Sequence, residues 1–147
     1  MRKLVRAMML TALTIGAMFY VAREADDMPP VRNGCVIGTV LSGDSLQLKC
    51  GGAEAALFQI AKLDAPNIET PGCAAELAHG TLAMERLQSL IKTGAVQIER
   101  LEGENTPPLI RLSVEGEDVA GRLIREGLAM AYDGGARFNW CEKLEAQ

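Results

Sequence analysis

Two cysteines flank a strand–turn–strand pattern, and this arrangement constrains the fold more than any other feature of the chain. Cys35 and Cys50 lie at equal distances from the turn at Ser42–Gly43. The segments between them and the turn, CVIGTVL and SLQLKC, carry the alternating apolar residues that are typical of strands. A hairpin about this turn brings the two cysteines together, so we expect a Cys35–Cys50 disulfide.

The other two cysteines, Cys73 and Cys141, are far apart in the sequence. Four cysteines permit three pairings, and the hairpin leaves Cys73–Cys141 as the second expected disulfide. The chain has no CxxC motif, and its single histidine does not complete a common zinc-binding set. An even number of cysteines after a secretory segment is typical of disulfides rather than of free thiols.

Residues 1–22 have the composition of a secretory or membrane-targeting segment. Three basic residues precede an uncharged, largely apolar run from Ala7 to Ala22. Two interpretations remain open: a cleaved signal peptide or a retained membrane anchor. A cut after Ala22 would place Tyr20 at the −3 position, where signal peptidases need a small residue. Because the apolar stretch approaches the ~20 residues that span a bilayer, we favour an N-terminal transmembrane helix over residues 1–22.

Charges on either side of this helix predict its orientation. Basic residues precede it, while Glu24, Asp26 and Asp27 follow it, so the N-terminus should stay in the cytoplasm. We therefore expect a single-pass protein of the bacterial inner membrane with a periplasmic domain. Residues 23–33 form a linker with a Pro pair, and residues 34–147 form the domain.

The charge of the exported part disfavours nucleic acid as a partner. Without the three basic residues of the anchor, 12 basic residues face 19 acidic ones, which gives a net charge of −7. Surfaces that grip nucleic acid are normally basic. The preferred partner is instead a membrane protein complex, bound through both the N-terminal helix and the exported domain.

The order of predicted elements indicates a mainly β fold with helices, of the α+β class. We expect strands at 35–41, 45–50, 55–63, 96–101 and 109–114, helices at 73–93 and 118–126, and an irregular tail at 132–147. Five antiparallel strands in a barrel, with a helix between the third and the fourth, is the OB-fold arrangement.

Four stretches of sequence, together with this order, resemble the staphylococcal-type thermonuclease family. They are VLSGDSLQL, FQIAKLDAP, AAELAHGTLAMERLQSLI and VEGEDVAGRLIREGLAMAY, and the resemblance runs from about Cys35 to Ala131. In that family one aspartate from the first turn and one after the third strand bind calcium. The resemblance assigns these roles to Asp44 and Asp64, with the backbone carbonyl of Ala65 as a third ligand. Such a vestigial site would hold Ca²⁺ weakly, at about millimolar affinity, and no other cofactor is expected.

The groups that perform hydrolysis in the family are missing from this chain. Gln59 and Pro107 stand where the resemblance places two phosphate-binding arginines, and Asn67 stands in place of the glutamate that activates water. Such arginines contribute on the order of 10³–10⁵ in rate, and a general base contributes about 10²–10⁴. The sequence therefore predicts a pseudoenzyme without catalytic residues, serving as an accessory subunit of a membrane complex such as a respiratory one.

One alternative keeps the catalysis. Glu69 and Arg111 could replace the missing groups if their segments followed a different path, which would give a membrane-tethered, Ca²⁺-dependent nuclease. His79 has no nucleophile or metal ligand spaced around it, so we interpret it as an ordinary histidine on a helix surface.

Overall fold

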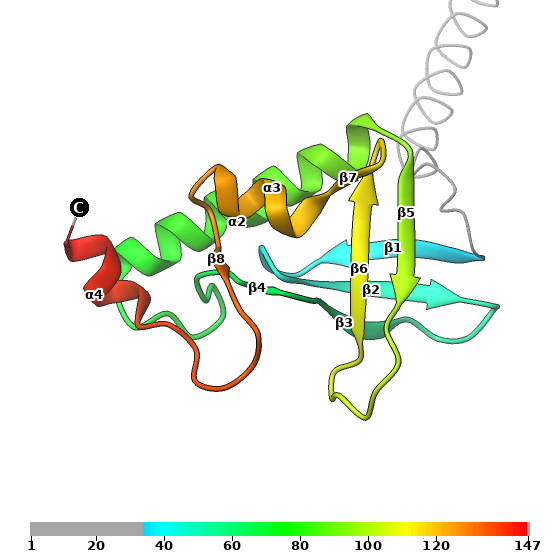
Figure 1. Ribbon diagram of the computed structural model, residues 1–147, viewed down its shortest axis with the longest axis horizontal. Coiled ribbons are helices and arrows are strands. Elements are labelled where there is room, and N and C mark those ends of the chain that lie inside the picture. The colour runs from blue at the N-terminus through cyan, green and yellow to red at the C-terminus, as the bar shows by residue number, and fades with distance from the viewer. Residues whose placement is uncertain (1–33, 147) are drawn as a thin grey trace, which may run out of the picture.

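A computed structural model describes residues 34–146 (Figure 1). The predicted hairpin is present as β1 (Cys35–Val40) and β2 (Ser45–Cys50), which pair in antiparallel register with Cys35 opposite Cys50. Both expected disulfides, Cys35–Cys50 and Cys73–Cys141, are formed. The hairpin geometry therefore follows from the turn and from the spacing of the cysteines.

The third strand is divided in two, where the sequence predicts one strand over residues 55–63. β3 (Ala56–Ile60) pairs with β2, and a turn at Lys62, whose φ is 65°, separates it from β4 (Leu63–Asp64). A left-handed residue redirects the chain, so β4 leaves the main sheet. It pairs instead with β8 (Met130–Ala131), which comes from the far end of the chain.

The main sheet curls into a half-barrel. Its strands lie in the order β1-β2-β3-β6-β5, where β5 is Val96–Arg100 and β6 is Leu109–Val114, and the short β7 (Glu117–Asp118) pairs with β6. Among residues 34–146 no ladder joins β1 to β5, so the sheet does not close. The fully antiparallel arrangement that we expected is wrong at one place, because β3 and β6 run parallel. A parallel neighbour needs a crossover connection, and residues 61–108, which include the long helix, provide it.

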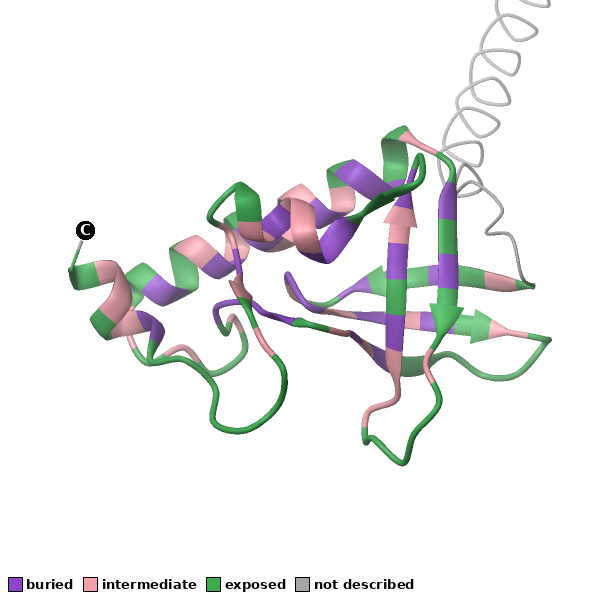
Figure 2. Ribbon diagram, viewed as in Figure 1, coloured by how far each residue is buried: buried purple, intermediate pink, exposed green. Residues whose placement is uncertain are grey.

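Helices cover one side and one end of the sheet (Figure 1). α2 (Ala74–Thr93) and α3 (Val119–Arg125) bury Leu87, Leu90 and Leu123 against strand residues of the core. Figure 2 shows buried and exposed residues alternating along β5 and β6, as expected for strands with one face on a core. The β strands and helices together form one mixed α+β unit.

The tail contains a helix that the sequence pattern did not predict. α4 (Trp140–Glu145) begins after Asn139, whose side chain accepts a hydrogen bond of 3.3 Å from the backbone N–H of Glu142. Six residues are too few to display a helical period of apolar residues, which is why the tail looks irregular in the sequence. α4 packs against α2, to which the Cys73–Cys141 disulfide also ties it.

A two-pronged ion pair joins α2 to the end of α3. Arg86 donates through Nε and Nη2 to the two carboxylate oxygens of Glu126, at 2.7 Å each. These hydrogen bonds lower the pKa of Glu126 to about 2. Glu126 therefore stays ionised at any pH near neutrality, and the two helices stay linked.

No helix within residues 34–146 has both the length and the apolar character needed to cross a membrane. The predicted anchor at 1–22 and the linker at 23–33 lie outside the described residues, so both stay predictions.

Candidate functional site

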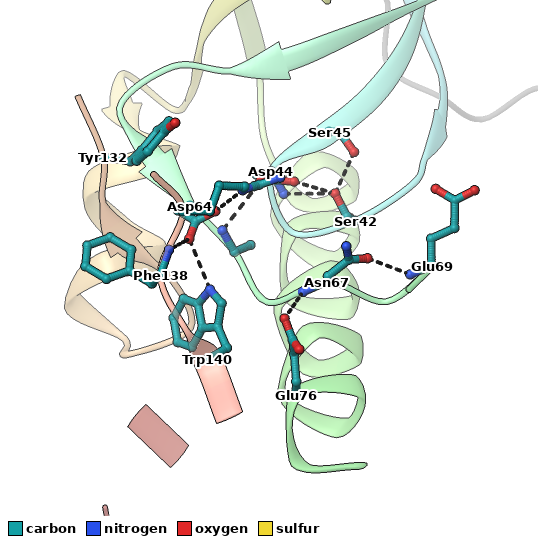
Figure 3. Close-up of polar contacts among 12 residues, drawn as sticks. Ser42, Asp44, Ser45, Asp64, Asn67, Glu69, Glu76, Tyr132, Phe138 and Trp140 are labelled. Carbon is teal, nitrogen blue, oxygen red and sulfur yellow. Dashed lines mark hydrogen bonds and ion pairs between the residues drawn. The ribbon is translucent and has the colours of Figure 1, made fainter. Parts of the chain in front are cut away.

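The two predicted metal ligands, Asp44 and Asp64, lie next to each other (Figure 3). Asp44 follows the turn between β1 and β2, and its backbone carbonyl accepts a hydrogen bond of 2.8 Å from Ile60 N–H of β3. Asp64 ends β4, the short strand that the turn at Lys62 directs away from the main sheet. Both aspartates are buried, Asp64 completely.

A guanidinium from the C-terminal tail bridges the two aspartates. Arg137 donates through Nε to Asp64 Oδ1 and through Nη2 to Asp44 Oδ2. Arg137 was not among the site residues predicted from the sequence, since it follows Asp64 by 73 positions. The available signal was the Cys73–Cys141 disulfide, because it places residues just before Cys141 beside the start of α2.

The remaining carboxylate oxygens also accept hydrogen bonds. Asp64 Oδ2 accepts from the backbone N–H of Phe138 and from Trp140 Nε1, both at 3.2 Å. Asp44 Oδ1 accepts from the hydroxyl of Ser42 at 2.6 Å. Each of the four oxygens therefore has a donor, and the tail residues 137, 138 and 140 supply four of these hydrogen bonds.

This arrangement fits a guanidinium and does not fit a calcium ion. Ca²⁺ needs six to eight oxygen ligands at about 2.3–2.6 Å, whereas here the carboxylate oxygens face N–H and O–H donors. The backbone N–H of Ala65 also points at Asp44 Oδ2, at 3.5 Å. A cation at this position would meet the positive charge of Arg137 and would have to displace it.

The aspartates in turn stabilise the charge on the arginine. Burial alone would lower the pKa of Arg137, but the charges of Asp44 and Asp64 and their hydrogen bonds outweigh it and raise this pKa above its usual value. The guanidinium is half exposed, while the two carboxylates are buried. Arg137 therefore closes the solvent side of the aspartate pair.

The other positions assigned by the thermonuclease resemblance line one cleft beside this pair. The cleft has a volume of about 260 Å³ and is lined by Asp44, Gln59, Ala65, Asn67, Pro107 and Arg137, among others. The structure thus brings together residues that are distant in the sequence, such as Asp44 and Arg137, which are 93 positions apart. Among the described residues that line the cleft, Arg137 is the only one with a positive charge.

Asn67 builds the loop rather than pointing a free polar group at the cleft. Its Oδ1 accepts hydrogen bonds from the backbone N–H groups of Glu69 and Thr70, at 2.9 and 3.0 Å. An asparagine that bonds the backbone two residues later forms an Asx turn. The amide is therefore already committed to holding the loop in shape.

A buried glutamate of α2 holds the same loop from the other side. Glu76 accepts from the backbone N–H of Asn67 at 3.1 Å (Figure 3). It also accepts from the backbone N–H of Gly72 at 2.7 Å. It also lies beside Cys73 and Cys141, but their sulfurs are bonded to each other and supply no thiolate for a metal. Sequence reasoning missed this anchoring role, since one acidic residue in a first helical turn is common.

The two residues that could have replaced the missing catalytic groups are separated. Glu69 lines the cleft, whereas Arg111 lies on β6 and pairs with Glu99 of the neighbouring strand β5. His79 is partly exposed and makes a hydrogen bond of 2.9 Å between its Nε2 and the carbonyl of Gly127. It also lies against Trp140, with 6.0 Å between the ring centroids.

Gly80→Ala is expected to destabilise the protein although it lies inside a helix. Alanine in place of glycine usually stabilises a helix by about 1 kcal/mol. Here a Cβ would lie 2.6 Å from Ile68 Cγ2 and 2.6 Å from the carbonyl oxygen of Pro66, in the loop that shapes the cleft. Since a backbone atom cannot rotate away, we expect a net loss of about 1–2 kcal/mol in the free energy of unfolding, measured by urea denaturation.

Gly121→Ala is the matched control, because Gly121 also lies in a helix. Outside its chain neighbours and its own helix backbone, the atoms nearest to its added Cβ would be Asp118 Oδ2 at 3.2 Å and Arg125 Nη1 at 3.3 Å, which belong to side chains and not to backbone. This variant should be neutral or slightly stabilising. Equal effects of the two substitutions would contradict the close packing of the loop on α2.

A scan against models of protein families finds none that matches this chain. A search of curated proteins likewise finds no significant match. The resemblance to thermonucleases therefore rests on the sequence stretches described above, and the site is characterised by its geometry.

Proposed function

We propose that this chain is a catalytically inactive, thermonuclease-like accessory subunit, which residues 1–22 anchor in the bacterial inner membrane beside a larger protein complex. In this proposal the half-barrel is a variant of the OB-fold, and the domain faces the periplasm. A respiratory assembly is one complex of suitable topology. The observation that carries the proposal is the ion pair of Arg137 with Asp44 and Asp64.

This ion pair argues against hydrolysis at the cleft. Cleavage of a phosphodiester needs positive groups aimed at the oxygens on which negative charge develops. Arg137 supplies the only positive charge among the described cleft residues, and two buried carboxylates already neutralise it. Gln59 has hydrogen-bonding atoms but no charge, so it does not replace an arginine in this role.

The rim of the cleft supports a role in protein contact. Leu41 and Leu57 both line the cleft and are 38% and 42% exposed. Ile68 and Pro107 line it as well, which gives the cleft apolar walls. Exposed apolar side chains that lie together are a feature of surfaces that bind other proteins, whereas a phosphate backbone would favour basic walls.

Co-purification tests this proposal. The full-length protein, tagged after Gln147 and expressed at native level, would be extracted in mild detergent and analysed by native gel and mass spectrometry. We expect it to migrate with companions at a fixed ratio. Exchanging residues 1–22 for a cleavable signal peptide should release the domain in soluble form and weaken this association, since the helix would no longer contribute.

A third form of the protein separates membrane anchoring from recognition of the partner complex. Residues 1–22 would be exchanged for an unrelated transmembrane helix, which restores the membrane tether but not the sequence of the anchor. Association retained by this version would assign recognition to the exported domain, and association lost would assign it to the helix. Full-length protein that runs alone at its own mass would overturn the proposal.

The nuclease alternative has less support from the geometry. It needs Glu69 and Arg111 at one site, but only Glu69 lines the cleft, and Arg111 is paired with Glu99 elsewhere on the sheet. Hydrolysis of DNA by the purified protein, dependent on Ca²⁺ and abolished in Asp64→Ala, would favour this alternative.

A further inference from the structure

The C-terminal strap, defined here as residues 134–141, is attached to the domain at places other than Arg137. Trp140 is 3% exposed and lies against His79 of α2. Cys141 is bonded to Cys73, the residue that precedes α2. Asn139 caps the short helix α4, which packs on α2. These contacts hold the strap beside the aspartate pair whatever residue stands at position 137.

The strap and a hard cation would use the same oxygen atoms. Three of the four carboxylate oxygens accept hydrogen bonds from the strap: both of Asp64 and Oδ2 of Asp44. Two carboxylates held together are what Ca²⁺ and similar ions prefer as ligands. Because a tethered group is present at high effective concentration, the guanidinium has the advantage over an ion free in solution.

We propose that Arg137 is a built-in competitor for divalent cations, which closes a latent cation site at Asp44 and Asp64 as long as the strap is docked. The guanidinium carries the positive charge that the two buried carboxylates require, so the domain folds around them without a metal ion. Removing that charge takes the guanidinium donor away from Asp64 Oδ1 and Asp44 Oδ2, the two oxygens that a cation would then use, while Phe138 and Trp140 still donate to Asp64 Oδ2. This inference does not depend on the accessory role, since cation binding and complex formation are measured separately.

The expected effect of Arg137→Ala follows from the chemistry of the pair. Hydrogen bonds between charged groups are stronger than those between neutral groups, and in this variant the cation no longer has to displace the two that Arg137 makes. The affinity for Ca²⁺ should therefore rise by at least tenfold over that of the wild type. Arg137→Lys should give an intermediate affinity, because an ammonium keeps the charge but not the two-pronged geometry.

The single tryptophan of the chain makes binding visible. Trp140 Nε1 lies 3.2 Å from Asp64 Oδ2, so Tb³⁺ bound to this carboxylate would be sensitised by the indole. Full-length protein in mild detergent would be titrated with Tb³⁺, and the bound Tb³⁺ would then be displaced with Ca²⁺. We expect Ca²⁺-displaceable luminescence from Arg137→Ala at concentrations at least tenfold lower than from the wild type.

Two further variants locate the effect. Arg125 is an exposed arginine of α3 that pairs with Glu117. Arg125→Ala removes the same charge outside the aspartate pair, so its Tb³⁺ and Ca²⁺ titrations should match those of the wild type. Adding Asp44→Asn to Arg137→Ala should abolish the gain, because one of the two carboxylates is lost. A gain of equal size in Arg125→Ala would show a general effect of net charge and would overturn the proposal.

The proposal also fails if the wild type binds Ca²⁺ as tightly as Arg137→Ala, or if a folded Arg137→Ala protein gains no affinity. Thermal unfolding of each variant establishes that it is folded. Arg137→Gln, whose neutral amide keeps two N–H donors, is the second variant if alanine is not tolerated. If neither neutral residue gives a folded protein with raised Ca²⁺ affinity, Arg137 is a structural counter-charge only, and the competition is refuted.

Discussion

Asp64→Ala is expected to lower the free energy of unfolding by about 3 kcal/mol, the largest effect that we anticipate from one substitution. Removing one partner of a buried ion pair typically costs about 3–5 kcal/mol, and the half-exposed position of Arg137 places this pair at the low end. The change also leaves Phe138 N–H and the buried Trp140 Nε1–H without their acceptor. Urea denaturation followed by the fluorescence of Trp140 measures the loss.

Asp133→Ala serves as the control for this substitution. Asp133 is an exposed aspartate of the same tail, and exposed substitutions of this kind usually change stability by less than about 0.5 kcal/mol. The stability loss in Asp64→Asn should lie between those of Asp64→Ala and Asp133→Ala, because the amide oxygen of asparagine still accepts the hydrogen bonds of one of the two lost carboxylate oxygens. If Asp64→Ala is as stable as the wild type, the carboxylate does not hold the strap.

Loss of the Cys73–Cys141 disulfide should lower stability by about 4 kcal/mol, measured on the double variant Cys73→Ala/Cys141→Ala. In the chain-entropy account, a crosslink stabilises by restricting the unfolded chain, and it does so more for longer loops. This disulfide joins residues 68 positions apart. A loss of that size corresponds to a fall in Tm on the order of 15 °C for a domain of this length.

The other disulfide provides the comparison. Cys35 and Cys50 are 15 positions apart, so removing their bond should cost about 3 kcal/mol, less than removing Cys73–Cys141. A protein that tolerates the loss of Cys73–Cys141 better than the loss of Cys35–Cys50 would show that contacts other than the disulfide hold the strap on α2.

Local patterns predicted much of the fold from sequence. The hairpin and its disulfide follow from one turn and the positions of Cys35 and Cys50, which are local features. The long helix follows from apolar residues at helical spacing, and the structure places it at Ala74–Thr93. The class of fold follows from the order of these elements.

The parts that sequence did not predict depend on distant contacts. The left-handed conformation of Lys62, which splits the third strand, has no marker such as glycine, and β8, the partner of β4, comes from 130–131. The parallel contact of β3 with β6 depends on how the chain crosses over the sheet. Most of the positions assigned by the thermonuclease resemblance do line one cleft. Arg137, which neutralises Asp44 and Asp64, lies in a tail without apolar periodicity.

The bridge between Asp64 and Arg137 also determines when the domain can finish folding. A chain is synthesised from its N-terminus, so the segments that carry both aspartates exist before residue 137 does. Until then the two carboxylates lack their positive neighbour, and burying them would carry the cost of unpaired charge. The aspartate pair therefore reaches its buried, neutralised arrangement only once Arg137 has docked.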